Sequence, residues 1–402
     1  MVNVFNKALD ETIQVNRIIG KVEGHSQGPT VVFFAGIHGN ETAGVFALDS
    51  IFRTLTNSLV NGTVYGIAGN LNALNHHQRY IDEDLNRLWT DEKLNALKNK
   101  LVYNIEEKEQ TELYSILKDI INTNTGPFYF IDLHTTSSKT LPFITINDAL
   151  INRYFSKVFP VPIVLGIEEY LNGPLLSYIN TLGYVSLGFE SGQHDSAAAF
   201  SNSIAFIYLV LVNTTVMQSE DITGYPVYYN QLKEQSKNNI HFFEVVYLYA
   251  INKEERFEML PGFKSFQRIK KGAALAKSNN NKILSKFNAR LFMPLYQSKG
   301  QEGFFIIKTI TPLILQLSIV LRRLKLERLF VMLPGVFWET RDRKVLMIDL
   351  RVTKFFAKSI FHLFGYRKKK ISRHFMMLFN REQTAKVLQY KNELWYKKSS
   401  IF

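Results

Sequence analysis

Residues 30–44 read TVVFFAGIHGNETAG and place a histidine and a glutamate, His38 and Glu41, three positions apart directly after an apolar run. The run is typical of a strand that is buried on both faces of a sheet. Glycines surround the two polar residues, and glycine lets the backbone bend sharply and approach a site closely. We therefore expect a strand that ends in a tight turn and delivers two side chains able to bind a ligand.

Comparable apolar runs recur as far as about residue 215. They are short and rich in β-branched or aromatic residues, and they read TVVFFAGI, GTVYGIAGNLNA, PFYFIDLH, PFITIN, VPIVLGI and YVSLGFE. Helix-like stretches such as ETAGVFALDSIFRTL and TELYSILKDIINTN lie between them. This alternation predicts an α/β domain with a largely parallel or mixed sheet over residues 1–222.

The pattern changes after residue 222. Short apolar stretches separated by Gly, Asn and Lys turns predict a small all-β domain over residues 223–310. We interpret residues 311–402 as a basic, partly helical C-terminal extension. The stretch VTKFFAKSIFHLF at 352–364 predicts one helix there, because its apolar residues recur at helical spacing with lysines opposite.

The net charge of +13 is concentrated near the C-terminus. Residues 310–402 carry 20 Lys and Arg against 6 Asp and Glu, whereas residues 1–309 carry 28 against 29. Our first interpretation is a basic face on helices that pack against the rest of the protein. Contact with an anionic membrane surface ranks second, and nucleic-acid binding ranks third and is not expected.

The chain has no cysteine, so any metal must be held by His, Asp or Glu. The N-terminal stretch lacks the basic start and apolar run of a signal peptide, and a cytoplasmic location is therefore expected. The apolar stretch PLILQLSIVL at 312–321 is about half of the roughly 20 residues needed to cross a bilayer. We do not expect it to span a membrane.

Polar side chains leave the ends of three predicted strands, and these are His38, Glu41, His134 and Glu190. Ligands of open α/β sheets bind beyond the carboxyl ends of the strands, so the side chains are expected on one rim. Two histidines and one carboxylate suit a catalytic zinc ion, which takes three protein ligands and keeps one position open. We expect one zinc per chain on His38, Glu41 and His134, with Glu190 as the general base and acid.

Further candidate residues surround this group. Arg79 and Arg87, with Asn86 between them, would clamp a substrate carboxylate and polarise the scissile carbonyl, because a guanidinium presents a fixed fork of donors. Asp132 is a candidate outer partner of a metal ligand. His194 is expected in a loop that lines the pocket.

Each of these residues has a simpler interpretation when it is taken alone. A His-x-x-Glu pair often marks a helix start or a surface ion pair, and an isolated histidine on a strand is more often part of a hydrogen-bonded core. The two arginines also have acidic neighbours at 82–84 with which to pair. The shared position of these residues at strand ends nevertheless favours a site.

The motifs GIHGNETAG, RYIDEDLNR, DLHTT and GFESGQ, in this order over residues 30–195, resemble the succinylglutamate desuccinylase/aspartoacylase family. This family is related to the zinc carboxypeptidases. The later stretch FMPLYQSKGQEGFF is similar to the closing part of the family's β domain. The resemblance implies a zinc carboxypeptidase-like mixed sheet flanked by helices, followed by a small all-β domain that narrows the entrance.

The same resemblance implies zinc on His38, Glu41 and His134, with Glu190 as base and acid. It also implies substrate-facing roles for Arg79, which helps to polarise the carbonyl, for Asn86 and Arg87, which contact the substrate, and for Tyr296, which matches a tyrosine reaching the pocket from the β domain. Aspartoacylases place a second carboxylate-binding arginine before the catalytic glutamate, but residues 173–190 contain none. This difference argues against acetylaspartate as the substrate.

These observations predict a zinc-dependent amidohydrolase that cleaves the amide bond of an N-acyl amino acid or a similar small amide. A zinc carboxypeptidase acting on a peptide or a peptidoglycan stem is the alternative with related chemistry. An alternative of another class is a membrane- or nucleic-acid-associated binding protein that acts through the basic extension. An oligomer is compatible with each of these.

Overall fold

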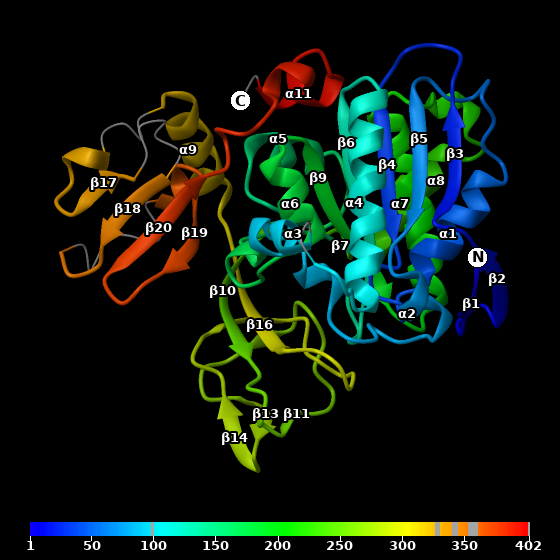
Figure 1. The fold of residues 1–402 in the computed structure, drawn as a ribbon. Helices are drawn as coiled ribbons and strands as arrows, with labels where there is room; N and C mark the ends of the chain where they lie inside the picture. The colour runs from blue at the N-terminus through cyan, green and yellow to red at the C-terminus, as the bar shows by residue number, and fades with distance from the viewer. Residues whose placement is uncertain (98–99, 326–329, 340–344, 353–360, 401–402) are drawn as a thin grey trace.

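The computed structural model describes residues 1–97, 100–325, 330–339, 345–352 and 361–400 (Figure 1). Its centre is a mixed sheet of eleven strands in the order β12-β15-β16-β10-β8-β7-β9-β6-β4-β5-β3. The six strands predicted before residue 215 are β4 (Thr30–Ala35), β5 (Thr63–Ala68), β6 (Phe128–Thr136), β7 (Phe143–Ile146), β8 (Ile163–Leu165) and β9 (Val185–Gln193). The predicted mixed α/β fold is therefore confirmed.

The middle of the sheet is parallel and its flanks are mixed. β5, β4, β6 and β9 are parallel neighbours, whereas β7 runs antiparallel to β9, and β3 (Ile18–Glu23) runs antiparallel to β5. The carboxyl ends of the parallel strands consequently meet at one edge, where loops can build a site. A separate antiparallel pair, β1 (Val2–Asn6) and β2 (Glu11–Val15), lies near the N-terminus.

Both faces of the sheet are covered by helices, and β4 illustrates why its sequence is apolar throughout. Val31 and Phe33 belong to one buried cluster, together with residues of α1 (Ala43–Phe52), α5 (Leu150–Ser156) and α7 (Ala197–Asn213). Val32 and Phe34 belong to a second cluster, together with residues of α4 (Ile105–Thr123) and α6 (Leu175–Thr181). A strand that is buried on both faces has no solvent-exposed face, so polar side chains are not favoured at any of its positions. The helices of this part are α1 (Ala43–Phe52), α2 (Leu71–Asn75), α3 (Asp91–Leu97), α4 (Ile105–Thr123), α5 (Leu150–Ser156), α6 (Leu175–Thr181) and α7 (Ala197–Asn213).

The part after residue 222 starts with a helix and then continues the central sheet. Helix α8 (Tyr225–Gln235) packs beside α7, and β10 (Phe242–Ala250) pairs in parallel with β8. The strands that extend the sheet further are β16 (Glu302–Thr309), β15 (Ala289–Phe292) and β12 (Arg268–Ile269). A small sheet of β11 (Phe257–Met259), β13 (Ala274–Ser278) and β14 (Asn281–Leu284) lies beyond them (Figure 1). We propose domain boundaries at residues 222 and 310. The central sheet crosses the first of these boundaries.

The C-terminal part contains more strand than we expected. It has the helices α9 (Pro312–Arg323) and α11 (Leu394–Ser400), but also a sheet of β17 (Val336–Trp338), β18 (Val345–Asp349), β20 (Phe375–Asn380) and β19 (Tyr366–Ile371). In β20 the side chains alternate between partly exposed and buried, which is the period of a strand with one covered face. Of the helix predicted over 352–364, residues 353–360 lie outside the described part, and 361–363 are helical.

This C-terminal part is attached to the α/β part of the chain, residues 1–222, through the core of the central sheet. The Tyr390 hydroxyl donates to the carbonyl of Phe128 (2.6 Å) and accepts from the amide of Val185 (3.0 Å), so it bridges β6 and β9 at their starts. Trp395 Nε1 donates to the Tyr129 hydroxyl (3.2 Å). Residues near the end of the chain thus complete the apolar core of the central sheet. Among the described residues, no helix has the length and apolar character needed to cross a membrane.

Candidate active site

The carboxyl ends of β4, β6 and β9 bring the predicted site residues together. His134 in β6 and Glu190 in β9 are direct partners in the parallel register of these neighbouring strands. His38 follows the end of β4, which pairs with β6 on its other side. The turn after β4 begins at Gly36, whose φ of 70° lies in the left-handed region that glycine tolerates.

His38, Glu41 and His134 form a buried group whose potential ligand atoms all lie within 4.8 Å of one another. The Glu41 carboxylate is at its centre, with Oε1 2.8 Å from His38 Nδ1 and Oε2 3.0 Å from His134 Nδ1. Both histidines therefore direct the same ring nitrogen toward one point. This donor set, two imidazole nitrogens and a carboxylate oxygen, is the one that catalytic zinc takes in several hydrolase classes.

Each histidine is oriented by a second carboxylate through its other ring nitrogen. His134 Nε2 lies 2.7 Å from Asp132 Oδ2, and His38 Nε2 lies 3.1 Å from Asp84 Oδ1. A carboxylate that accepts the Nε2 proton leaves Nδ1 unprotonated and able to bind a metal. Asp132 has the outer-partner position that we predicted. Asp84 was not predicted, although it lies in the motif RYIDEDLNR beside the two arginines.

The electrostatics of the group favour positive charge beside the Glu41 carboxylate. Burial alone would raise the pKa of Glu41, but His38 and His134 outweigh it and hold this pKa well below its usual range. Burial would lower the pKa of His134, yet Asp132 and then Glu41 raise it well above the ordinary value. The carboxylates around the imidazoles thus stabilise cationic charge, and a divalent metal fits the same position.

Glu190 lies beside this group in an environment that favours a bound proton. Burial raises the pKa of its carboxyl to about 8, and the nearby charge of His134 opposes the rise. Its Oε2 atom is buried and has no hydrogen-bond partner among the residues that the structure describes. A carboxyl group of this kind can accept and release a proton near neutral pH.

The three other predicted residues of the first half line the same cavity. Arg79 donates from Nη2 to Asp84 Oδ2 (3.1 Å), while its buried Nε has no partner within the described ranges. Arg87 donates to Glu302 Oε1 (2.9 Å), a residue of β16. The Asn86 side chain accepts from the amide of Leu175 (2.9 Å), so part of its role is to hold the start of α6.

The structure does not bring Tyr296 into this cavity. Its hydroxyl donates to the carbonyl of Leu260 (2.6 Å) and accepts from the amide of Phe263 (3.0 Å), and its ring lines a separate surface hollow. The neighbour Gln297 lines the cavity instead, with Oε1 3.1 Å from His194 Nε2. The structure thus places Tyr296 outside this cavity, and its role at the site stays a prediction. The loop 293–301 contains no strand, so the sequence offers no register by which to align it.

The cavity has a volume of about 130 Å³. Its walls come from both the first half of the chain and the loop after β15, which contributes Met293, Pro294 and Leu295. Asn147, Glu168 and Ser177 line it as well, and our sequence analysis singled out none of them. No motif marks these residues, since they enter the wall through the order of strands in the sheet.

Replacement of Gly39 by alanine is expected to disturb the buried group of His38, Glu41 and His134. A Cβ atom at Gly39 would overlap the backbone of Ala73, so the turn that carries His38 and Glu41 must move. We expect zinc affinity to fall by about tenfold or more, as for the loss of an orienting partner. Zinc titration by calorimetry measures this. Wild-type affinity in the variant would show that the close approach at Gly39 does not shape the turn.

Comparison with known proteins identifies relatives of this chain. Residues 27–196, which are less than half of this chain, match the succinylglutamate desuccinylase/aspartoacylase catalytic domain, and this part of the chain is a domain of that family. A probable aspartoacylase of Acaryochloris marina is 32% identical over 130 residues, which cover 31% of this chain and 41% of the relative. A succinylglutamate desuccinylase of Pseudoalteromonas atlantica is 26% identical over 275 residues, which cover 64% of this chain and 74% of the relative. The chain thus spans less than half of the first relative.

Solved structures share the fold at low sequence identity. A succinylglutamate desuccinylase/aspartoacylase from Rhodobacter sphaeroides superposes with a TM-score of 0.56 at 16% identity, over 72% of this chain and 88% of that one. A product-bound ectoine utilization protein from Ruegeria pomeroyi gives 0.54 at 15% identity, over 72% and 87%. An aspartoacylase family protein from Mesorhizobium loti gives 0.51 at 14% identity, over 77% and 93%. These similarities establish the architecture and leave the chemistry to the site itself.

Proposed function

We propose that this protein is a zinc-dependent hydrolase that cleaves the amide bond of an N-acyl amino acid. The buried group of His38, Glu41 and His134, with Glu190 on the adjacent strand, is the observation that carries the proposal. The family match and the relatives named as desuccinylase and aspartoacylase support it.

His38, Glu41 and His134 would hold the zinc ion, through Nδ1 of each histidine and the carboxylate between them. A bound zinc ion supplies Lewis-acid chemistry, since it polarises a carbonyl oxygen and lowers the pKa of water. Glu190 takes a proton from the attacking water and later delivers it to the leaving nitrogen. Burial raises the pKa of this carboxyl group to about 8 before any zinc ion is bound, which favours the protonated state that returns the proton.

Arg79 stabilises the negative charge that develops on the carbonyl oxygen in this mechanism. Its side chain is already fixed by Asp84 and Glu41, whose charges raise the pKa of the guanidinium against the effect of burial. A permanently charged donor that is held in place needs no reorganisation when the charge forms.

The charged residues that line the cavity favour a substrate with few carboxylates. Arg87 is positioned to bind one carboxylate, which must compete with its ion pair to Glu302 (2.9 Å). Residues 173–190 offer no further arginine, and Glu168 adds a carboxyl group to the wall. A cavity of about 130 Å³ also suits a small acyl amino acid better than a polymer. We propose an amino acid half with a single carboxylate.

The decisive assay is the release of free amine from N-acetyl, N-succinyl and longer N-acyl amino acids by the zinc-loaded protein. We expect hydrolysis within one acyl class and a preference for amino acids without a second carboxylate. Release of amino acids from short peptides in place of this activity would favour the carboxypeptidase alternative. Failure to hydrolyse any compound of the panel would contradict the proposal.

Zinc binding is expected to stabilise the fold measurably. A ligand that binds only the folded state at about 100 times its Kd adds about 2.7 kcal/mol to the free energy of unfolding. Urea titration of the metal-stripped protein, with and without zinc, measures this gain. His134→Ala should abolish it, whereas His76→Ala, which changes an exposed histidine outside the group, should retain it. An equal gain in both variants would place the zinc elsewhere.

A further inference from the structure

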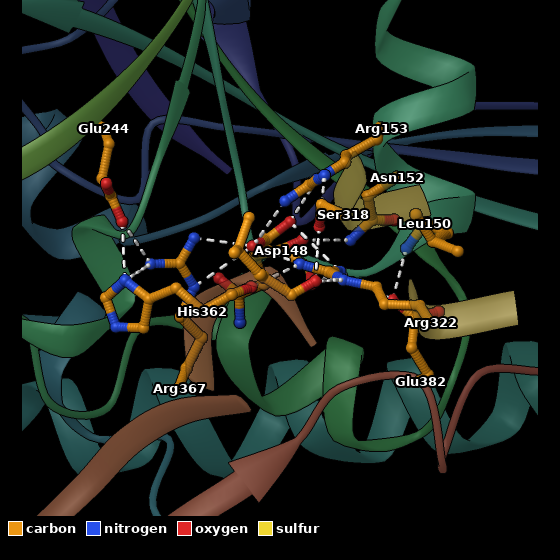
Figure 2. A network of polar contacts seen from close by, with 12 residues as sticks. Asp148, Leu150, Asn152, Arg153, Glu244, Ser318, Arg322, His362, Arg367 and Glu382 are labelled. Carbon is orange, nitrogen blue, oxygen red and sulfur yellow. Dashed lines mark hydrogen bonds and ion pairs between the residues drawn. The ribbon is translucent and has the colours of Figure 1, made fainter. Parts of the chain in front are cut away.

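Asp148 is a fully buried carboxylate that three arginines surround, and two of them come from the C-terminal part (Figure 2). Arg153 of α5 contacts Asp148 from nearby in the chain. Arg322 of α9 and Arg367 of β19 also contact it, although they follow it by 174 and 219 positions in the sequence. The distances to Asp148 Oδ2 are 2.9 Å from Arg322 Nη2, 2.6 Å from Arg367 Nη2 and 2.9 Å from Arg153 Nη2. Part of the basic character of this segment therefore faces inward, not toward solvent.

Arg367 also binds a second stretch of the catalytic part. Its Nη1 donates to Glu169 Oε1 (2.9 Å) and to Glu244 Oε1 (2.8 Å). His362 lies between the same two carboxylates, 2.9 Å from Glu169 and 2.7 Å from Glu244. One guanidinium thereby ties together the loop after β7, the turn before α6 and strand β10.

Arg367 binds Asp148 and Glu169, and the residue that precedes each of them lies in the wall of the cavity. Asn147 precedes Asp148, and Glu168 precedes Glu169, and both Asn147 and Glu168 line the cavity. The Asp148 amide donates to Glu168 Oε1 (3.3 Å), which joins the two stretches to each other. Arg322 adds a bond from Nη1 to the Asp148 carbonyl (3.1 Å), so the backbone is held as well as the side chain.

Such a network is a costly way to attach one part of a protein to another. Removing several charges from water costs free energy that apolar packing of the same volume would not require. The guanidinium fork, however, fixes direction as well as distance, which apolar contacts do not. The arrangement is therefore suited to holding the cavity wall in a defined geometry.

We propose that Arg322 and Arg367 are positioning residues through which the C-terminal part fixes Asn147 and Glu168 in the cavity wall and so sets substrate preference. The effect on substrate preference rests on the proposed amide hydrolysis, whereas the positioning of Asn147 and Glu168 by the two arginines does not. The wall lies beside the metal group and binds the part of the substrate that does not react. Disturbing it should weaken substrate binding more than it slows the chemical step.

The test compares Arg367→Lys and Arg322→Lys with the wild type in the full-length, zinc-loaded protein. Lysine keeps the charge, but a single ammonium cannot span the acceptors, on three or more residues, that each guanidinium binds. We expect faster backbone hydrogen exchange in peptides that cover 144–150 and 165–171, with the zinc content unchanged. For the best N-acyl amino acid, KM should rise by about tenfold or more while kcat changes by less than about threefold.

The matched control is Arg323→Lys, since Arg323 is the exposed neighbour of Arg322 and donates to the Tyr154 hydroxyl (3.0 Å). It should leave both exchange and KM at wild-type values. Unchanged exchange in Arg367→Lys and Arg322→Lys would overturn the proposal, and so would faster exchange with an unchanged KM. If the wild type hydrolyses no substrate, the exchange data still decide whether the arginines position the wall. If Arg367→Lys does not fold, Glu169→Gln replaces it, because Glu169 is a partner of Arg367. Hydrogen exchange and KM are then measured for this variant.

Discussion

Replacement of Glu190 by glutamine is expected to lower kcat by about 10³-fold while zinc binding stays stoichiometric. Glutamine keeps the size of the side chain but cannot take a proton from water or return it to the leaving nitrogen, and acid–base residues commonly contribute 10²–10⁴-fold. Steady-state hydrolysis of the best N-acyl amino acid, together with metal analysis of the same sample, measures both quantities.

The control for this variant is Glu112→Gln, which removes a carboxylate on the exposed side of α4 where it pairs with Arg17. It should retain wild-type kcat and KM. Turnover of Glu190→Gln at the wild-type rate with zinc bound would exclude Glu190 as the proton carrier. Loss of zinc along with activity would instead indicate that Glu190 supports the metal group.

Replacement of Asp148 by asparagine is expected to destabilise the protein by about 3–5 kcal/mol, the cost of breaking a buried ion pair by removing one partner. The change leaves Arg153, Arg322 and Arg367 close together without the charge that they share. Urea unfolding followed by tryptophan fluorescence gives the free energy of unfolding and shows whether the transition stays cooperative.

Asp349→Asn provides the matched control within the C-terminal part. Asp349 pairs with Arg351 (2.6 Å), and although the Asp349 side chain is only 13% exposed, that of Arg351 is 62% exposed, so water screens the pair and weakens its contribution. Its unfolding midpoint should lie close to that of the wild type. A similarly small effect of Asp148→Asn would show that the buried network adds no net stability.

The pKa of Asp148 predicts how the stability of the fold depends on pH. Burial alone would raise the pKa of Asp148, but Arg153, followed by Arg322 and Arg367, holds it well below its usual range. A carboxyl group with a depressed pKa stabilises the fold above its unfolded pKa of about 3.9 and loses this contribution as the pH falls through the folded value. The wild type should therefore begin to lose its advantage over Asp148→Asn below about pH 4, and this advantage should decline further toward pH 3, in thermal unfolding measured from pH 6 to pH 3. Burial raises the pKa of neighbouring Glu382, which acts with the opposite sign, so the difference between the two proteins is the quantity to follow. An advantage that persists unchanged to pH 3 would contradict this assignment.

Much of the sheet and the convergence at its edge could be predicted from the sequence. The apolar runs at β4, β6 and β9 have no other favourable place than a doubly covered sheet, and ligands gather at the carboxyl ends of parallel strands. His38, Glu41 and His134 could therefore be assigned to one point before any coordinates were known. Asp84 could not be selected in the same way, since Asp82 and Glu83 beside it are chemically equivalent in the sequence.

Contacts between distant parts of the chain were beyond prediction. Nothing in YRKKKISR distinguishes Arg367, which is buried against Asp148, from its basic neighbours. The alternation in β20 was present in the sequence, but a single short strand gives too weak a signal to predict a sheet. Glu168 and Asn147 entered the cavity wall only through the strand order, which no local pattern encodes.

The bridge that Tyr390 makes between β6 and β9 has a consequence for biosynthesis. Phe128 and Val185 leave the ribosome more than two hundred residues before the hydroxyl that joins them. The core at the starts of the two strands that carry His134 and Glu190 consequently cannot be closed until residue 390 has been synthesised. Nascent chains that stop before residue 390 lack this closure and expose apolar surface of the central sheet, which makes them natural targets of chaperones and proteases.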